Sequence, residues 1–232
     1  MKRRAFVESA MTMLPAFAVL GVPKINLGQE LQPIALPKPE KDGGKSLLAS
    51  ILERKTIRGI SPDSLPPQML SNLLWAAFGV NRPEGVRGKP GRTAASASNL
   101  QEIDLYIALP QGVYLYEAVP HRLTPVVPGD FRARSGRRDA TTAPVNIFYV
   151  VDLTKYVVEG QPDRNIGDPE VQKSYYFVAT GLIASNVYLF AASQGLAAWF
   201  HNCEKENTAK EFHLRPEQRV LFAQTVGFPA KM

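Results

Sequence analysis

The sequence contains very few of the residues that form disulfides or hold structural metals. Cys203 is the single cysteine among 232 residues, so no intramolecular disulfide can form. With one cysteine and only His121, His201 and His213, the chain cannot supply the cysteine-rich ligand sets of structural zinc sites, and we expect no metal. A chain of this length buries about 70% of its unfolded surface, so it needs neither kind of crosslink to fold.

Long runs of one charge are also absent. Lysine and arginine total 27 against 21 aspartates and glutamates, and the composition, at 21% charged and 45% hydrophobic, is that of an ordinary globular protein. The densest basic cluster is Arg132, Arg134, Arg137 and Arg138, flanked by Asp130 and Asp139. No recognisable nucleic-acid module with stacking aromatic residues accompanies it. We therefore expect a solvated helix or loop there and no nucleic-acid partner.

The first 28 residues have the pattern of an export signal. Lys2, Arg3 and Arg4 precede a mildly apolar run over residues 10–22, which is too short for a membrane-spanning helix. The arginine pair followed by small and apolar residues is similar to a twin-arginine signal. We expect an exported protein of the periplasm or cell envelope. If the segment is instead an ordinary amphipathic helix, the protein is cytoplasmic.

The rest of the chain divides into a linker and one folded domain. Residues 29–45 contain three prolines and a Gly-Gly pair without sustained periodicity, which predicts a linker. Residues 46–232 form the expected domain, and residues 80–98 are a long polar loop within it. Ser46 is expected to cap a helix with an apolar face at Leu47, Leu48, Ile51 and Leu52. Further helices are predicted from Pro66 to Gly79 and over 205–212, and strands over 103–109, 113–117, 122–126, 145–151, 196–200 and 220–226.

A long segment without charge lies in the second half of the domain. None of the 27 positions from Ser174 to Phe200 is charged, so by length alone it could span a membrane. Its internal serines, Asn186 and Gln194 favour a buried central helix instead, ended by Gly195. Because few other elements are available to cover such a helix, we expect a homodimer with Ser185 and Asn186 close to the twofold axis or to a ligand pocket. No stable membrane insertion is expected.

Three segments could bind a ligand. Arg54, Lys55, Thr56 and Arg58 could hold a phosphate, although basic residues at a helix end also complement the helix dipole. The segment 92–101 combines small residues with two amides, Asn99 and Gln101, which suit a ring edge or polyol; the alternative is a capped turn. The segment 195–203 is a strand that ends in two aromatic and then polar residues, where the alternative is simple core packing.

Together these segments resemble the flavin-dependent nitroreductase family, over Ser46 to Ala230. The family's Arg-x-Ser-x-Arg/Lys motif holds the phosphate and ribityl chain of FMN, and Arg54, Thr56 and Arg58 match it. Its Pro-Ser-Ser-x-Asn-x-Gln motif lines the flavin ring and is matched by Ala95, Ser96, Ala97, Asn99 and Gln101, with alanine at two positions. The family's turn whose backbone N–H groups face flavin N5 and O4 falls on His201, Asn202 and Cys203. Lys55 is included among the expected cofactor contacts.

Within the family, two short segments are similar to the azoline-dehydrogenase-like branch. They are Gly112 to Tyr116 and His121 to Leu123. That branch oxidises thiazoline and oxazoline rings in modified peptides, which makes such an activity one alternative. A family segment of the type Pro-x-Lys-x-Arg has no counterpart after Pro229, so either Lys231 and the first motif supply the phosphate charge or the affinity for FMN is reduced.

The resemblance implies an α+β, nitroreductase-like fold with a mainly antiparallel central sheet, flanking helices and a long buried central helix. It implies FMN as cofactor, NADH or NADPH as a candidate electron donor, and hydride transfer through flavin N5 to a small-molecule acceptor. It further implies a homodimer with flavin at the interface, and no residue is assigned a catalytic role. The competing interpretation is a non-catalytic flavin- or ligand-binding protein on a degenerate nitroreductase scaffold.

Overall fold

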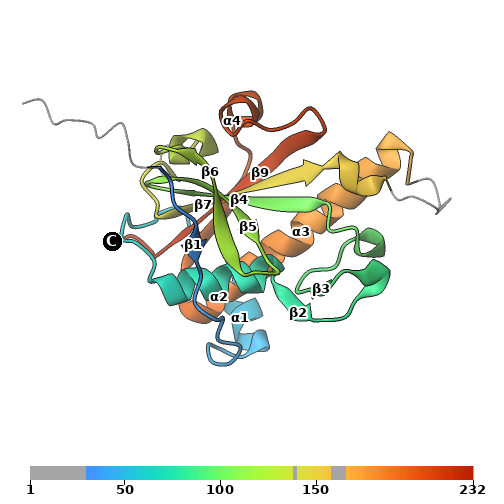
Figure 1. Cartoon of the computed structure of the whole chain (residues 1–232). Coiled ribbons are helices and arrows are strands. Elements are labelled where there is room, and N and C mark those ends of the chain that lie inside the picture. Colours follow the sequence, from blue (N-terminus) through green and yellow to red (C-terminus); the bar gives the residue numbers. More distant parts are fainter. Residues whose placement is uncertain (1–29, 138–139, 158–165, 232) are drawn as a thin grey trace, which may run out of the picture.

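A seven-stranded antiparallel sheet is the centre of the structure, a computed structural model that describes residues 30–137, 140–157 and 166–231. The strand order is β1-β6-β5-β4-β7-β9-β8 (Figure 1). The strands are β1 (Ile34–Ala35), β4 (Ile103–Leu109), β5 (Gly112–Glu117), β6 (Arg122–Pro128), β7 (Val145–Asp152), β8 (Ala197–His201) and β9 (Gln218–Gly227). The expected export signal, residues 1–28, lies outside the described residues, as do Arg138 and Asp139.

The sheet is buried on both faces because its inner strands are apolar at successive positions. In β4, Ile103, Leu105 and Ile107 pack in the main core, while Tyr106 and Ala108 belong to a second cluster on the other face. All eight residues of β7 are buried. A period of two on two apolar faces is what a central strand requires.

The described residues contain four α-helices, α1 (Leu47–Glu53), α2 (Pro67–Phe78), α3 (Pro169–Gln194) and α4 (Lys205–Glu211), of which α1 packs against α3 and not against the sheet. Residues of α2 and α3 pack in the main core and Phe212, which follows α4, packs in the second, so the helices lie on opposite faces (Figure 1). Ser46 caps α1 with its hydroxyl, which accepts a hydrogen bond from the Ala49 amide. Gly195, at φ +70°, ends α3. The predicted helix and strand positions are therefore confirmed, and with them the α+β class.

Two helices leave apolar side chains uncovered in the single chain. On α3, one side is buried against the sheet, but Val178 is 62% and Leu182 42% exposed. By length and composition alone α3 could cross a membrane. Only 39% of its most apolar stretch is buried within the chain. The apolar face predicted for α1 does not pack inward, since Leu48 is 78% and Leu52 86% exposed. Burial on all sides is thus not reached within one chain.

The segment predicted as a linker is partly integrated into the fold. In β1, Ile34 pairs with Leu123 of β6. The chain then crosses α2: the Gln68 side chain donates to the Lys38 carbonyl at 3.0 Å, and the Glu40 amide donates to Asn72 Oδ1 at 2.9 Å. We call residues 34–41 the N-terminal strap. The linker prediction failed here because side chains of α2, distant in sequence, supply the hydrogen bonds.

Two short strands, β2 (Val80–Arg82) and β3 (Gly91–Arg92), pair with each other at the end of α2. Both strands lie within residues 80–98, the long polar segment for which the sequence predicts a loop. A 3₁₀ turn at Val86–Gly88 lies between the two strands, and a second one at Ala97–Asn99 follows β3 before the chain enters β4. The loop prediction is thus met over most of its length, with a small hairpin at its base.

Candidate functional site

Residues 54–58, which we call the basic segment, lie alongside the start of β8. The Ile57 amide donates to the Ala198 carbonyl at 3.0 Å and fixes the segment there. The Arg54 guanidinium lies 5.3 Å from the centre of the Tyr188 ring, and that of Arg58 lies 5.4 Å from the ring centre of Trp199. Both arginines are exposed, and within the described residues neither forms an ion pair with a carboxylate.

The other two members of the basic segment have different surroundings. The Thr56 hydroxyl lies 3.0 Å from the hydroxyl of Tyr188, which also accepts a hydrogen bond from the Phe200 amide at 2.8 Å. Thr56 therefore ties the segment to α3 and β8. Lys55 lines a separate cavity of about 270 Å³ with Glu53 and Leu196. Lys55 thus has surroundings of its own within the basic segment, and its contact with a cofactor stays a prediction.

The end of β8 brings together the predicted residues 201–203, but it points them in different directions. His201 is buried, its ring centre 4.7 Å from that of Trp199, with Nδ1 at 2.9 Å from the Asn202 carbonyl and Nε2 at 2.9 Å from Thr225 Oγ1. Burial, reinforced by the nearby charge of Arg137, lowers the pKa of His201, so the neutral ring is favoured at pH 7. Asn202 remains exposed.

Cys203 turns away from the arginines into the second core cluster. It is packed with residues that include Phe212 and Phe148. Burial raises the pKa of the Cys203 thiol to about 11, which keeps it protonated at neutral pH. Its side chain is therefore a core residue, and a contact between its backbone, two residues past the end of β8, and a flavin stays a prediction.

Arg137 is a site residue that the sequence did not reveal. Its guanidinium lies 5.8 Å from the Trp199 ring centre, so two arginines contact the same indole. The neighbours in its cluster are engaged elsewhere: Arg132 pairs with Asp130, and Arg134 pairs with Glu211. The prediction of a solvated basic helix or loop is therefore wrong for the Arg132 side chain, which is 13% exposed. No local pattern distinguishes Arg137 from these neighbours.

Residues 86–101, which we call the amide loop, use their polar side chains on one another. Arg92 Nε donates to Gln101 Oε1 at 2.8 Å, and Gln101 Nε2 donates to the Pro90 carbonyl at 2.7 Å. Asn99 Nδ2 donates to the Val86 carbonyl at 3.0 Å. The Ser96 hydroxyl accepts a hydrogen bond from the Gln101 amide at 3.0 Å. The amides that were expected to face a ligand instead hold the loop closed.

This closed loop contains unusual backbone conformations. Ser98, Asn99 and Gln101 have φ values of +49°, +55° and +56°, in the left-handed region that costs non-glycine residues about 1–2 kcal/mol each. The predicted contacts Ala95 and Ala97 are exposed and half-buried respectively. Such conformations persist only where surrounding interactions enforce them, and they concentrate at functional sites. Here the side-chain hydrogen bonds enforce them.

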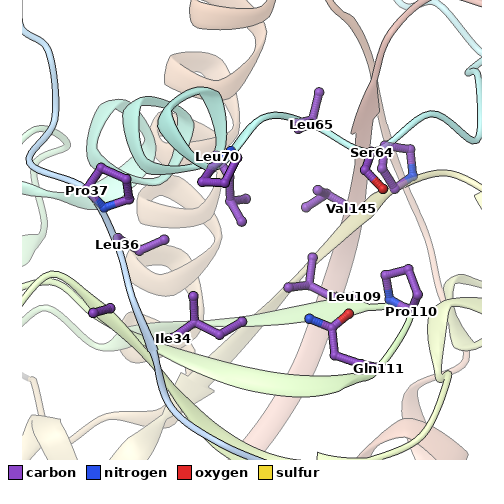
Figure 2. Close-up of a pocket in the computed structure, with 13 residues that line it drawn as sticks. Ile34, Leu36, Pro37, Ser64, Leu65, Leu70, Leu109, Pro110, Gln111 and Val145 are labelled. Carbon is purple, nitrogen blue, oxygen red and sulfur yellow. The ribbon is translucent and has the colours of Figure 1, made fainter.

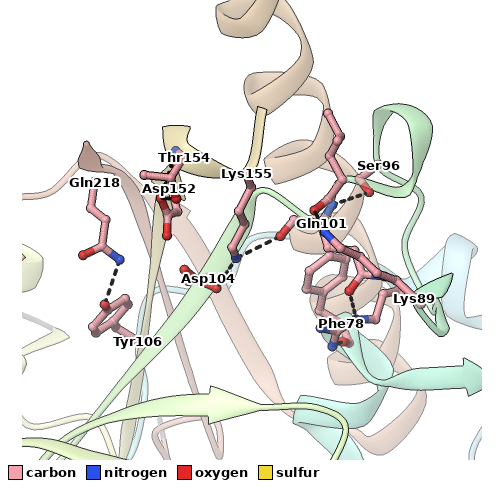
Figure 3. A network of polar contacts seen from close by, with 12 residues as sticks. Phe78, Lys89, Ser96, Gln101, Asp104, Tyr106, Asp152, Thr154, Lys155 and Gln218 are labelled. Atoms are coloured by element: carbon pink, nitrogen blue, oxygen red, sulfur yellow. Dashed lines mark hydrogen bonds and ion pairs between the residues drawn. The ribbon is translucent and has the colours of Figure 1, made fainter. Parts of the chain in front are cut away.

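Beyond the amide loop, charged groups gather at the start of β4 (Figure 3). Lys155 Nζ donates to Asp104 at 2.6 Å and to the Gln101 carbonyl at 3.0 Å, and Lys89 Nζ donates to the Leu100 carbonyl at 3.1 Å. Glu102 is fully buried, and neither of its carboxylate oxygens has a hydrogen bond of normal geometry within the described residues. Burial raises the pKa of Glu102. This network anchors the loop to the sheet.

Helix α3 separates the basic segment from the amide loop. Tyr188 contacts Thr56, while Asn186, two residues earlier, lies with Nδ2 at 3.3 Å from the Thr93 carbonyl. Across the described ranges, no hydrogen bond, ion pair or ring contact joins residues 54–58 or 199–203 directly to residues 92–101. A cavity of about 370 Å³ opens beside Asn186, lined also by Thr93 and Trp75. A single chain therefore presents two half-sites.

The residues fit FMN at one of these half-sites. Exposed guanidiniums that have no carboxylate partner among residues 30–137, 140–157 and 166–231 suit a phosphate, and the adjacent Tyr188 and Trp199 rings are suited to contact with a flat ligand. The amide loop fits less directly, because Asn99 and Gln101 would have to exchange internal hydrogen bonds for ligand contacts. The fit thus rests on the basic segment.

Comparison with known proteins identifies the family of this chain. Residues 51–228 match the model of the nitroreductase family. A protein of Methanocaldococcus jannaschii that carries a nitroreductase name is 24% identical over 186 residues, covering 76% of this chain and 88% of its own. A crystal structure from Ralstonia eutropha JMP134, also described as a nitroreductase, is 32% identical, covers 89% of this chain and 93% of its own, and has a TM-score of 0.77.

A third likeness is to a chain of the Escherichia coli microcin synthetase complex McbBCD, solved with truncated pro-MccB17 bound. It covers 95% of this chain and 85% of its own, with a TM-score of 0.60 and 17% identity, which is a likeness of fold. The family model spans well over half of the chain, and the Ralstonia relative matches nearly all of it. This chain belongs to the nitroreductase family.

Proposed function

We propose that this protein is an FMN-dependent oxidoreductase that passes hydride from a reduced donor to a small acceptor. The observation that carries the proposal is the exposed pair Arg54 and Arg58, which have no carboxylate partner in the part of the chain that the structure describes and lie against the rings of Tyr188 and Trp199. When bound, FMN would supply the hydride chemistry, with NADH or NADPH as the candidate donor. The protein would supply the phosphate charge, the aromatic wall and the backbone at residues 201–203.

The chain's own groups suit binding rather than proton transfer. The neutral His201 ring is held between Thr225 and the Asn202 carbonyl, and the Cys203 thiol faces the core. Arg137 would add a second positive charge beside Trp199. We assign no acid–base residue, because hydride transfer to a flavin requires none from the protein.

The test is whether purified protein carries flavin and whether that flavin is reduced. We expect visible flavin absorbance, either as isolated or after adding FMN and removing the excess. Anaerobic NADH or NADPH should bleach it, and a small electron acceptor should restore it. Protein that binds no FMN at all would overturn the proposal. A protein that binds FMN but is reduced by neither nicotinamide would favour the non-catalytic alternative, which the internally bonded amides of Asn99 and Gln101 support.

We further propose a homodimer in which α3 packs near its symmetry mate and the flavin lies at the interface. The exposed apolar side chains of α3 and α1, with Val178 at 62% and Leu48 at 78%, support it. A second copy would bring its amide loop to the basic segment of the first, and so combine two half-sites that one chain keeps apart. Val178→Lys should yield a monomer in sedimentation, while Val119→Lys, at a 67% exposed valine on the β5–β6 turn, should not. A wild-type monomer at micromolar concentration that still holds flavin would contradict the dimer.

Export remains a proposal based on residues 1–28 alone. The arginine pair and short apolar run support a mature chain that lacks them. Intact-mass measurement of protein recovered from its native cell decides this, because a chain that starts at Met1 contradicts cleavage. Replacing Arg3 and Arg4 by lysine should block export only if the twin-arginine route is used. As for substrate, the likeness to the microcin synthetase complex is one of fold, so we do not carry its peptide over to this chain.

A further inference from the structure

An open cavity of about 220 Å³ lies where the N-terminal strap crosses the beginning of α2. Figure 2 shows aliphatic side chains from the strap, α2, β4 and β7 facing this common space. The lining residues are Ile34, Ala35, Leu36, Pro37, Ser64, Leu65, Pro67, Leu70, Leu109, Pro110, Gln111, Pro144 and Val145. None of them belongs to either half-site described above, so this is a separate place on the molecule.

The cavity has an apolar floor and an accessible rim. Leu65, Leu70, Leu109 and Val145 are buried at its base, each no more than 9% exposed. Around the mouth, Ala35, Ser64, Pro67, Pro110 and Gln111 are exposed. A concave site with an aliphatic base and a few polar groups at its edge is the usual form of a small-molecule site.

The lining selects the charge of the occupant. The lining includes no aspartate, glutamate, lysine, arginine or histidine. The whole chain, by contrast, has 27 lysines and arginines and 21 aspartates and glutamates. An ion placed there would lose its hydration without a partner, which is costly. Four of the lining residues are prolines, which have no N–H to donate, so Ser64 and Gln111 carry the polar side chains of the lining. The lining therefore suits a neutral molecule with a single hydrogen-bonding group.

The strap wall is fixed before any ligand arrives. The Ser71 hydroxyl contacts the Pro37 carbonyl at 2.5 Å and His121 Nε2 at 2.7 Å, and His121 Nδ1 contacts the Tyr116 hydroxyl at 3.0 Å. A neutral His121 allows this chain of bonds to be continuous from Tyr116 to Pro37, and burial favours that form by lowering its pKa. Walls held by hydrogen bonds and prolines lose little freedom on binding.

The volume limits the size of the ligand. A dry cavity of about 150 Å³ is large enough for benzene, while drug-sized ligands occupy roughly 300 Å³ or more. The 220 Å³ here lies between these values. We propose that this cavity is a binding site for a neutral, mainly apolar molecule of about the size of indole, with one hydrogen-bonding group directed to Ser64 or Gln111.

The experiment compares indole with two charged analogues of the same ring, indole-3-acetate and tryptamine, on the full chain. We expect indole to raise the melting temperature and to bind in calorimetry, with both analogues at least about 10-fold weaker because their charge would be buried. Ser64→Phe should fill the mouth and abolish indole binding. Asp63→Phe is the matched control, since Asp63 is an exposed neighbour outside the lining, and it should bind indole as the wild type does.

A second measurement locates the ligand. In crystals soaked with 5-bromoindole, the anomalous signal of bromine should lie between Leu70, Leu109 and Val145. The melting temperature of Ser64→Phe should be no lower than that of Asp63→Phe. This result would show that Ser64→Phe loses indole binding without losing its fold. The proposal is overturned if indole fails to bind, if binding survives Ser64→Phe, if the charged analogues bind equally well, or if the bromine lies elsewhere. None of these results depends on flavin, so the site stands or falls apart from the proposed oxidoreductase activity.

Discussion

The basic segment and the amide loop both match flavin-binding motifs, yet they are built in opposite ways. Arg54 and Arg58 have exposed charges and no carboxylate partner among the described residues, so the segment is ready for an anion. In the amide loop, Gln101 and Asn99 bond to Arg92 and to backbone carbonyls, and the backbone is held at positive φ. Matching a motif therefore does not show whether its side chains are free to bind. The following changes test that difference, from the largest expected effect to the smallest.

The largest effect is expected from removing the charges of the basic segment. Arg54→Ala and Arg58→Ala should each weaken FMN binding by about 10- to 100-fold, because each deletes a charge-assisted contact, and the double variant should be folded and colourless. Flavin titration of the purified variants measures this. Arg82→Ala with Arg219→Ala removes the same charge from two other exposed sites and should bind normally. Unchanged flavin content in the first double variant would mean that the segment only complements the end of α1.

Next in size is the effect of opening the amide loop. Gln101→Ala removes the acceptor of Arg92 Nε and a donor to Pro90, so the free energy of unfolding should fall by about 1–3 kcal/mol. Denaturant unfolding measures it, and Gln32→Ala is the control, because Gln32 makes one exposed hydrogen bond to the Glu30 carbonyl. If Gln101→Ala instead leaves stability unchanged and lowers only flavin affinity, the amide is a ligand contact and the contrast between the two segments disappears.

A smaller, pH-dependent effect is expected at Glu102. Its pKa is raised by burial, so the folded protein retains a proton that the unfolded chain releases near the usual glutamate pKa. Stability should therefore fall as pH rises from the ordinary glutamate pKa through the raised one, by ~1.4 kcal/mol for each unit between them. Glu102→Gln should remove this slope, so its stability relative to the wild type should rise in thermal unfolding as the pH increases above the ordinary glutamate pKa. Glu84→Gln, at an exposed carboxylate, should change nothing, and equal slopes in wild type and Glu102→Gln would refute the assignment.

The smallest effect is expected from relieving backbone strain in the amide loop. Ser98 has φ +49° and is exposed. Ser98→Gly should relieve backbone strain of about 1–2 kcal/mol in the folded state, and the greater freedom of glycine in the unfolded chain should offset about 0.5–1 kcal/mol of that gain. We expect a net stabilisation of no more than about 1 kcal/mol in denaturant unfolding, with flavin affinity unchanged. Ser61→Gly is a control at a negative-φ position and should destabilise slightly. A loss of stability in Ser98→Gly would indicate that the serine side chain, rather than its backbone, holds the turn.

The local pattern was sufficient for the helices and the longer strands of the domain, and for the family, but not for the short strands β1, β2 and β3. Ser46, Pro67, Gly79 and Gly195 mark helix ends through capping and ring geometry that act within a few residues. The apolar runs of β4 and β7 predict buried strands because a central strand must be apolar on both faces. Family resemblance rests on the spacing of a few residues, such as Arg54, Thr56 and Arg58, and the family match confirms it.

Tertiary structure decided what each of those residues touches. Among the described residues Arg58 lies against an aromatic ring without a carboxylate partner, whereas Arg134 is paired with Glu211, some 77 positions away. Which of these applies to an arginine depends on which segments fold together. The same applies to the strap, whose partners Gln68 and Asn72 lie some 30 positions along the chain, and to the cavity beneath it. Periodicity and capping are local and can be read from neighbouring residues. Free charge, closed loops and cavities depend on long-range contacts, which no local pattern encodes.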